Sequence, residues 1–540
     1  MAAMPTPKVS VVVPVYNPGQ YLHRCVKSLL GQTIPAAQYE TIFVDDGSTD
    51  GSAAYLDSVA RSHLCVRVIH QENSGWPGGP RNVGLAGAMG DYVFFCDADD
   101  WLAGNALERL YGHAVEWESD IVVPKVAGLG RRVPHQLFTR TRPRVSLATA
   151  PLMDSLSPHK LFRRAFLEEH QIWFPEGKRR LEDHYFVVSA YLQAQVVSIA
   201  ADQTYYYLVR RRDGGNISTG PVDWEEYFRS LAEAIELVER HIEPGPSRDR
   251  LLQRWLQWEM CRRLSGKRYL KRCPEDVQEL FKEAHAVARD HFGPGVVSLL
   301  PPVLQTVGQA IIAGDATALQ RHAQAIAGWS IQAKIRYLGW AAERLQVSGT
   351  ARLTDHQPDS SPAALEQRFA ELAPGMSTPA LMAALRSTTI ALELVSEATG
   401  ERWVLPIERH GTGLDQGFTA EIDCEHAANG RPLPDGIWGL EVSLRTLGFT
   451  DRQRLQIVGE RLHEMPRPTN RPHQRPTAVS VGQQGRLMLG IGCPASPSRQ
   501  TTWASRVARR LPPPVKRILR PVWQRIHRWP RHEFPIRPAT

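Results

Sequence analysis

The chain has 540 residues, a formal net charge of +8, 42% hydrophobic residues and 22% charged residues. This length exceeds what one hydrophobic core supports, so we expect two to four domains of a soluble, globular kind. The longest apolar stretch, 296–313, is interrupted by prolines and glutamines, and the N-terminus lacks the charged and apolar regions of a signal peptide. The sequence therefore predicts neither a membrane-spanning helix nor a cleaved leader.

Cysteines and charges are distributed unevenly along the chain. Seven cysteines are scattered, and no two have C-x-x-C spacing, which argues against a disulfide framework or a zinc site and fits a reducing cytoplasm. Fifteen arginines and lysines but one acidic residue follow residue 465, so this tail carries +14 and the rest carries −6. The basic character belongs to the tail.

The first hundred residues alternate between strand and helix patterns. Valine-rich and apolar runs predict strands at 8–16, 39–46, 66–75 and 92–96. The segments between them carry apolar residues at helical spacing. This alternation predicts an α/β fold with a mostly parallel sheet and crossover helices. Ligands of such sheets bind beyond the carboxyl ends of the strands.

Polar clusters follow three of these strands. They are Tyr16-Asn17, Asp45-Asp46 and Asp97-Ala98-Asp99. One such cluster alone is equally typical of a turn, because Asp is common in turns. Three clusters at three strand ends favour a polar cleft.

The pattern changes twice further along the chain. Four segments with helical periodicity follow residue 220, the last of them at 315–345, and two-fold periodicity with turn signals begins at about residue 346. The second pattern predicts a small antiparallel sandwich. Residues rich in Pro and Arg come last and are typical of disorder. We therefore expect four parts, at 1–220, 221–345, 346–465 and 466–540.

Several motifs carry a resemblance to a known family. They are "VSVVVPVYNPGQYLHRCVKSLLGQT", "IFVDDGSTDGS", "ENSGWPGGPRNVGLAGAMGDYVFFCDADDW" and "FPEGKRRLEDHYF". This ordered set resembles the family 2 glycosyltransferases of the GT-A fold, over about residues 8–220. Together with the helical and sandwich regions, the "GGPRN" segment is similar to one subgroup, the bacterial wall teichoic acid (polyribitol-phosphate) N-acetylglucosaminyltransferases.

The resemblance implies a uridine diphosphate sugar as donor. Asp46 could accept a hydrogen bond from a uracil N–H, while Pro14 and Tyr16 offer a carbonyl and an aromatic face to the base. Taken alone, Arg81 would be a surface cation and Asn73 a turn residue. In this ordered set, the residues predicted to bind the donor are Pro14, Tyr16, Asp46, Asn73, Arg81, Asp97, Ala98 and Asp99.

Asp97-Ala98-Asp99 is the D-X-D motif of this family. Alternation at a strand end turns both carboxylates toward one region of the cleft. Mg²⁺ or Mn²⁺ prefers such oxygen ligands and would neutralise charge on the departing diphosphate. We expect Asp99 to be the direct metal ligand and Asp97 to contact ribose or metal. Asp100 is expected to cap the following helix.

The pair Glu182-Asp183 precedes a helical segment. A carboxylate there could simply cap the helix, since it gains from the helix dipole. The functional alternative is a general base that removes the proton of the acceptor hydroxyl. The resembling family places this base at Asp183.

Two basic segments have open interpretations. Arg210-Arg211-Arg212, within 205–218, is either a loop that closes over diphosphate or acceptor, or a solvated charge run. The segment 512–529 has two interpretations. It is either an amphipathic basic helix, kinked at Pro521, that lies on an anionic membrane surface, or a disordered basic tail. Nucleic acid binding has no other support in the chain.

These observations predict an inverting, metal-dependent glycosyltransferase. It would move a sugar from a UDP-sugar to a hydroxyl of a cell-surface polymer such as a teichoic acid, and the resemblance implies that the sugar is GlcNAc. Its expected location is the cytoplasm, at the inner face of the membrane. Alternatives are a transferase for a capsular or other wall polysaccharide, and a nucleotide-sugar-binding scaffold without turnover. The sandwich would bind polymer or form a homo-oligomer.

Overall fold

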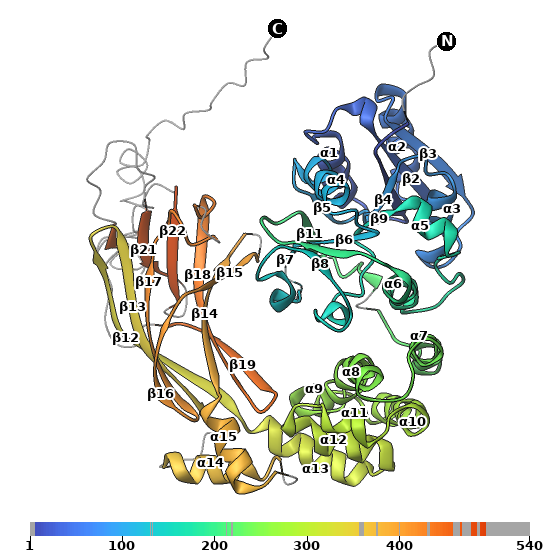
Figure 1. Cartoon of the computed structure of the whole chain (residues 1–540). Helices are drawn as coiled ribbons and strands as arrows, with labels where there is room; N and C mark the ends of the chain where they lie inside the picture. The colour runs from blue at the N-terminus through green and yellow to red at the C-terminus, as the bar shows by residue number, and fades with distance from the viewer. Residues whose placement is uncertain are drawn as a thin grey trace, which may run out of the picture.

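The computed structural model describes most of the chain outside the C-terminal tail. The described residues are 6–129, 131, 133–211, 213–217, 220–355, 361–373, 376–398, 400–428, 432–456, 465–466, 477–482 and 486–492. They form an N-terminal α/β region, a helical region and a C-terminal region of antiparallel sheets (Figure 1). The mixed α/β fold with further helical and β regions is the predicted class, which is confirmed. No disulfide joins the six described cysteines.

An eight-stranded sheet forms the centre of the α/β region. Its strand order is β3-β2-β1-β4-β9-β6-β10-β8, and only β9 and β8 run antiparallel to their neighbours. The strands are β1 (Val9–Val15), β2 (Tyr39–Asp46), β3 (Val66–Gln71), β4 (Tyr92–Phe95), β6 (Ile121–Pro124), β8 (Arg142–Val145), β9 (Leu161–Arg163) and β10 (Val197–Ala200). Parallel pairing brings the carboxyl ends of β1, β2 and β4 to one edge, where the polar clusters lie.

Helices cover this sheet because their apolar residues recur every three or four positions. α1 buries Leu22, Cys25, Val26 and Leu29 in this way. α3 lies so close to β1 that a Cβ at Gly84 would come within 2.3 Å of Val12 Cγ1, so only glycine fits there. The helices are α1 (Tyr21–Leu30), α2 (Ser52–Ser62), α3 (Gly78–Ala86), α4 (Ala106–Glu116), α5 (Arg164–Glu169) and α6 (Glu182–Gln193).

A small second sheet lies beside the D-X-D motif. Its order is β5-β11-β7, with β5 at Trp101–Leu102, β11 at Tyr206–Val209 and β7 at Val126–Leu129. This sheet carries Tyr206, which is fully buried, to the end of β4.

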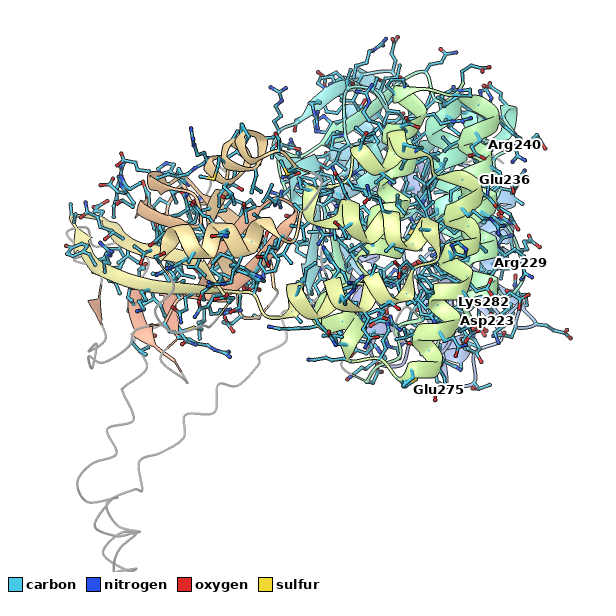
Figure 2. The ribbon with its side chains drawn as sticks, turned by 90° about the horizontal axis from the view of Figure 1, so that it is seen from below. Asp223, Arg229, Glu236, Arg240, Glu275 and Lys282 are labelled. Atoms are coloured by element: carbon cyan, nitrogen blue, oxygen red, sulfur yellow. The ribbon has the colours of Figure 1, made fainter. Side chains whose placement is uncertain are left out.

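The helical region continues the same hydrophobic core, which includes buried Trp224 and Trp255. Its helices are α7 (Trp224–His241), α8 (Pro246–Trp255), α9 (Gly266–Leu270), α10 (Pro274–His291), α11 (Pro294–Ser298), α12 (Pro302–Ala313) and α13 (Ala316–Ala327). Their outer face carries exposed charged side chains, as Figure 2 shows for Asp223, Arg229, Glu236, Arg240, Glu275 and Lys282. None of the described helices is long and apolar enough to cross a membrane.

The helical segment predicted at 315–345 is confirmed for α13 but wrong from residue 330 onward. β12 (Ser330–Ala341) and β13 (Arg344–Thr354) form a hairpin there, in the four-stranded sheet β12-β13-β17-β16. Alternate residues of β12, Ile331 and Ala333, are buried. The spacing of alanine and isoleucine in this stretch fits the period of a helix as well as that of a strand. Pairing with β13, rather than local propensity, therefore makes it a strand.

A second antiparallel sheet packs on the first through a shared core. Its order is β15-β14-β18-β22-β21-β20, and β19 also pairs with β18. The remaining elements are α14 (Pro362–Ala370), α15 (Thr378–Arg386), β14 (Thr389–Ser396), β15 (Arg402–Leu405), β16 (Glu408–Thr412), β17 (Asp415–Ile422), β18 (Gly436–Thr446), β19 (Phe449–Arg454), β20 (Met465–Pro466), β21 (Thr477–Val481) and β22 (Leu487–Ile491).

The prediction of a disordered tail from residue 466 is therefore wrong for β21 and β22. Leu487, Leu489 and Ile491 alternate into the core, a pattern that the surrounding Pro and Arg content obscured. The predicted amphipathic segment 512–529 lies outside the described residues.

Candidate active site

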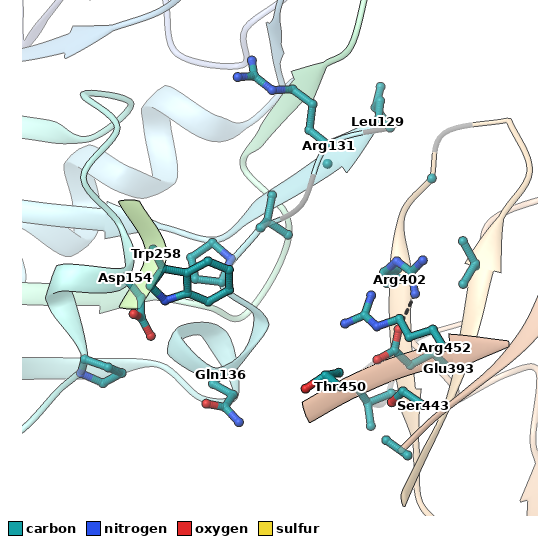
Figure 3. Close-up of a pocket in the computed structure, with 18 of the residues that line it drawn as sticks. Leu129, Arg131, Gln136, Asp154, Trp258, Glu393, Arg402, Ser443, Thr450 and Arg452 are labelled. Atoms are coloured by element: carbon teal, nitrogen blue, oxygen red, sulfur yellow. Dashed lines mark hydrogen bonds and ion pairs between the residues drawn. The ribbon is translucent and has the colours of Figure 1, made fainter. Parts of the chain in front are cut away.

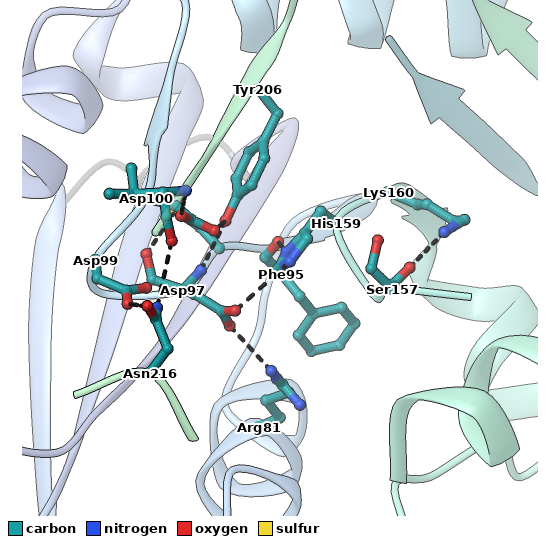
Figure 4. Close-up of polar contacts among 12 residues, drawn as sticks. Arg81, Phe95, Asp97, Asp99, Asp100, Ser157, His159, Lys160, Tyr206 and Asn216 are labelled. Atoms are coloured by element: carbon teal, nitrogen blue, oxygen red, sulfur yellow. Dashed lines mark hydrogen bonds and ion pairs between the residues drawn. The ribbon is translucent and has the colours of Figure 1, made fainter. Parts of the chain in front are cut away.

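Arg81 joins two of the predicted motifs. Its Nη2 donates to Asp97 Oδ1 at 2.9 Å, and its Nη1 donates to Glu182 Oε1 at 2.8 Å. The side chain is buried, so the surface-cation interpretation is wrong. Burial opposes its charge, yet the carboxylates of Asp97 and Glu182 raise the pKa of Arg81 above its usual range. The end of β4 and the start of α6 are thus held together by one guanidinium (Figure 4 shows the Arg81–Asp97 contact).

Asp99 lies beside Asp97 at the opening of this cluster. The side-chain amide of Asn216 donates to Asp99 Oδ2 at 2.9 Å. Burial and the charge of Asp97 raise the pKa of Asp99 to about 6. Two crowded carboxylates of this kind gain from a cation between them, so the oxygen set fits a hard divalent ion.

Asp100 does not cap a helix, and that prediction is wrong. Trp101–Leu102 forms β5, and the next helix begins at Ala106. Asp100 is fully buried and accepts hydrogen bonds from the Tyr206 hydroxyl at 2.8 Å and the Val209 amide at 2.6 Å. It therefore ties the D-X-D turn to β11, a strand more than a hundred residues away.

His159 also faces Asp97, with Nε2 3.5 Å from Oδ2, and its ring stacks on Tyr206 (Figure 4). Asp97, Asp100 and His159 could offer one ligand atom each to a cation. Asp100 is fully buried, however, and both of its oxygens bind Tyr206 and Val209, whereas Asp99 lines an open cleft. Asp97 with Asp99 is therefore the better acidic pair for a metal.

Asp183 differs from its neighbour in its partners. Glu182 is bound by Arg81 and by the indole N–H of Trp76 at 3.0 Å. Asp183 accepts from the backbone N–H of His184 at 2.9 Å, and no ion pair to it is present among the described residues. Burial and the charge of Glu182 raise the pKa of Asp183 to about 7, against the effect of Arg81. This first-turn contact matches the capping interpretation, and the raised pKa matches a base.

A buried lysine lies near Asp183. Lys160 is fully buried and donates to the Ser155 hydroxyl at 3.3 Å and to the Ser157 carbonyl. Burial lowers its pKa to about 7, while the charge of Asp183 acts in the opposite direction. An acidic group and a basic group whose pKa values are both shifted toward 7, as for Asp183 and Lys160, are typical of functional sites.

The predicted base-binding residues lie together at the ends of β1 and β2. The carboxylate of Asp46 accepts from the Ser74 amide and hydroxyl, both at 3.0 Å, and from Gln71 Nε2 at 2.6 Å. Asn73 donates to the Asp46 carbonyl at 3.0 Å and stabilises a turn through Gly75. Pro14 pairs in register with Val44 of β2. Asp46 thus links the end of β2 to the turn at 73–75 through part-buried hydrogen bonds.

Tyr16 follows β1, and its side chain is 55% exposed, as a base-stacking ring would have to be before the donor binds. Ala98, between the two aspartates, is buried and has no polar side chain to offer. Its contribution to donor binding is limited to its backbone.

The described part of the segment 205–218 contacts the D-X-D motif and the residue after it through Tyr206, Val209 and Asn216. Arg211 Nη1 donates to the Asn17 carbonyl at 3.4 Å and the guanidinium lies 5.1 Å from the Tyr21 ring centroid. The Arg211 amide donates to Asn216 Oδ1 at 2.7 Å, and Asn216 in turn reaches Asp99. The interpretation of this segment as a solvated charge run is therefore wrong for Arg211, whereas Arg210 is exposed to solvent. Arg212 lies outside the described residues.

Sequence reasoning missed several site residues. The fold brings together three separate parts of the chain that supply them, namely Trp76, His159 with Lys160, and Tyr206 with Asn216. The one available signal was Asn216, which directly follows the Gly214-Gly215 pair after the basic run.

Comparisons with known proteins agree with this geometry. Residues 10–173 match Glycosyl transferase family 2, and residues 224–323 match the Glycosyl transferase TarS linker domain. The chain is 40% identical to a poly(ribitol-phosphate) beta-glucosyltransferase of Bacillus spizizenii over 43% of this chain and 37% of that protein. It is 35% identical to poly(ribitol-phosphate) beta-N-acetylglucosaminyltransferase TarS of Staphylococcus aureus, over 46% and 44%. The matched region thus spans under half the length of these two relatives.

Two further matches cover most of the related chain. The S. aureus poly(ribitol-phosphate) beta-N-acetylglucosaminyltransferase TarP is 33% identical over 43% of this chain and 72% of its own length. The crystal structure of S. aureus TarS 1–349 in complex with UDP-GlcNAc has a TM-score of 0.53 and 28% identity, over 63% of this chain and 96% of that chain. The motifs, the site and these matches together place the chain in family 2 of the glycosyltransferases, to which it belongs.

Proposed function

We propose that this glycosyltransferase transfers GlcNAc, with inversion, from UDP-GlcNAc to a hydroxyl of a poly(ribitol phosphate) teichoic acid. One observation carries the catalytic part: Asp183 has no ion-pair partner among the described residues and a pKa of about 7, next to the Arg81–Asp97 pair. The donor and acceptor are supported by the substrates that the names of the similar proteins print.

In the proposed reaction Asp183 accepts the proton of the acceptor hydroxyl. The oxygen then attacks the anomeric carbon, the bond to the diphosphate breaks, and UDP leaves. A single displacement converts an α-linked donor sugar into a β-linked product. Arg81 holds Asp97 and Glu182 in place, which leaves Asp183 as the carboxylate available for proton transfer.

Asp99 and Asp97 would hold Mn²⁺ or Mg²⁺, which would neutralise charge on the leaving diphosphate. Arg211 and Arg131 act electrostatically on Asp99 and are near enough to favour the anionic diphosphate as well. Pro14, Tyr16, Asp46 and Asn73 would hold the uridine.

An assay of UDP release tests this proposal against a scaffold without turnover. With Mn²⁺ and poly(ribitol phosphate), we expect UDP-GlcNAc to release UDP faster than other UDP-sugars, and EDTA or Asp99→Ala to reduce that rate by about 10²-fold or more. UDP binding without release from any UDP-sugar would favour the scaffold. Release that requires a different wall or capsular polymer would replace the proposed acceptor.

The pH dependence of the reaction follows from the raised pKa of Asp183. A base must be deprotonated, so kcat/KM should fall about tenfold per pH unit below about pH 7, where Asp183 becomes protonated. If the base were an aspartate with an ordinary pKa of about 3.9, kcat/KM would not fall between pH 7 and pH 5. A pH–rate profile between pH 5 and 8 is the measurement, and a flat profile would contradict the assignment.

The basic tail stays a prediction of contact with an anionic membrane at the cytoplasmic face, based on its charge of +14. Self-association through the C-terminal sheets likewise stays a prediction.

A further inference from the structure

A large groove leads away from the candidate active site. Its volume is about 2240 Å³, and its walls come from the α/β region, from the helical region and from the sheet strands β14, β15, β18 and β19 (Figure 3). Asp99 lies on its lining, so the groove begins at the D-X-D motif. Sites for small ligands have volumes of about 300–1,000 Å³. The groove is therefore larger than a nucleotide sugar needs.

The lining is rich in arginine on all three walls. Among the described residues, eleven arginines and six acidic residues line the groove, and none of the lining residues is a lysine. Arg131 and Arg211 lie toward the active site, where both act electrostatically on Asp99. Arg402 donates to both Glu393 and Glu441, at 2.5 and 2.6 Å, and Arg452 and Arg454 lie 4.0 and 3.9 Å from Glu441, so these two acids are paired with arginines of the same wall. The arginines outnumber the acids, and this surplus of positive charge along the groove favours an anionic ligand.

The sheet wall is attached to the other regions near the groove. Thr204 of the α/β region donates to Glu401 at 3.3 Å, and the Lys125 ammonium lies 4.0 Å from the Trp403 ring centroid. The Val303 amide of α12 donates to the Leu447 carbonyl at 3.0 Å. These contacts hold the face of β14, β18 and β19 opposite the active-site side of the groove.

The groove also offers surfaces for carbon chains and hydroxyls. Trp258 is 40% exposed, with the Arg262 guanidinium 4.4 Å from its ring centroid. Gln136 and Ser443 face the open space from opposite walls (Figure 3). Guanidinium forks suit phosphates, and aromatic and amide groups suit a polyol.

We infer that the face formed by β14, β15, β18 and β19 is an acceptor-binding wall, along which an anionic polyol-phosphate chain lies while one of its hydroxyls enters the active site beside Asp99. This inference rests on the proposed function for the identity of the chain. It assigns Arg445 and Arg452 to phosphate contacts, since both line the groove from β18 and β19.

The test compares two double variants of the full-length enzyme. Arg445→Gln with Arg452→Gln removes two charges from the groove. Arg386→Gln with Arg409→Gln removes two charges from the same C-terminal region, at positions that do not line the groove. Binding of long inorganic polyphosphate is measured for both, together with kcat/KM for long poly(ribitol phosphate) relative to a short oligomer. Thermal unfolding confirms that both variants are folded.

The groove variant should bind polyphosphate about tenfold more weakly than the control variant, and its long-to-short kcat/KM ratio should fall by a similar factor. Both differences should shrink at high salt. Equal polyphosphate affinity in the two variants would overturn the anion site, and an unchanged long-to-short ratio would overturn the acceptor role. If the groove variant binds polyphosphate more weakly but even the parent enzyme transfers no sugar to poly(ribitol phosphate), the anion site is supported and the proposed acceptor is contradicted.

Discussion

Asp183→Asn should reduce the rate of sugar transfer by about 10²- to 10⁴-fold, the usual contribution of a general base. The change is isosteric, and the amide oxygen of Asn can still accept from the His184 N–H that Asp183 binds at 2.9 Å. Removal of a proton acceptor that acts in the transition state lowers kcat, while the affinity for UDP should stay within about twofold.

Single-turnover kinetics and UDP titration calorimetry separate these two effects. Asp57→Asn is the matched control, because Asp57 is exposed on α2 and far from proton transfer in the proposed reaction. If Asp183→Asn retains the parent rate, the base is another group, and the raised pKa of Asp183 has a structural cause only.

Arg81→Met should destabilise the enzyme by about 3–5 kcal/mol, the cost of leaving buried carboxylates without their partner. Asp97 and Glu182 would both lose charge-assisted hydrogen bonds that are now 2.9 and 2.8 Å long. The loss should appear as a lower urea midpoint for the α/β region, accompanied by loss of transfer activity.

A second change separates charge from packing. Glu182→Gln in the Arg81→Met background removes one of the stranded charges and should recover part of the stability, which a double-mutant cycle measures. Arg61→Met, at the exposed end of α2, is the control with the same loss of charge. A midpoint for Arg81→Met equal to that of Arg61→Met would show that the guanidinium is not needed to hold the two motifs together.

The sequence predicts the α/β fold well because each early strand carries its own signal. The valines of β1 and the apolar run of β4 are buried as continuous strands, and the turn residues after them mark the strand ends. The motifs around Asp97 and Asp183 also identify the family, which the comparisons confirm.

What the sequence did not predict depends on long-range contacts. Asp100 looks like a helix cap until β11 supplies Tyr206 to bind it. Ile331 and Ala333 fit a helix until β13 pairs with them. Leu487 and Leu489 lie in a basic, proline-rich stretch, yet their strand pairs with the neighbouring β21 and also with β18, which lies much earlier in the chain. In each case a partner outside the local window decided the structure.

The most direct test of the account is the linkage formed on the acceptor. Poly(ribitol phosphate) is incubated with the full chain, UDP-GlcNAc and Mn²⁺, and the purified polymer is analysed by proton NMR alongside the released UDP. The account predicts β-linked GlcNAc on ribitol hydroxyls in an amount equal to the UDP released. An α-linked sugar would contradict a single displacement assisted by Asp183, and UDP release with unmodified polymer would contradict the proposed acceptor.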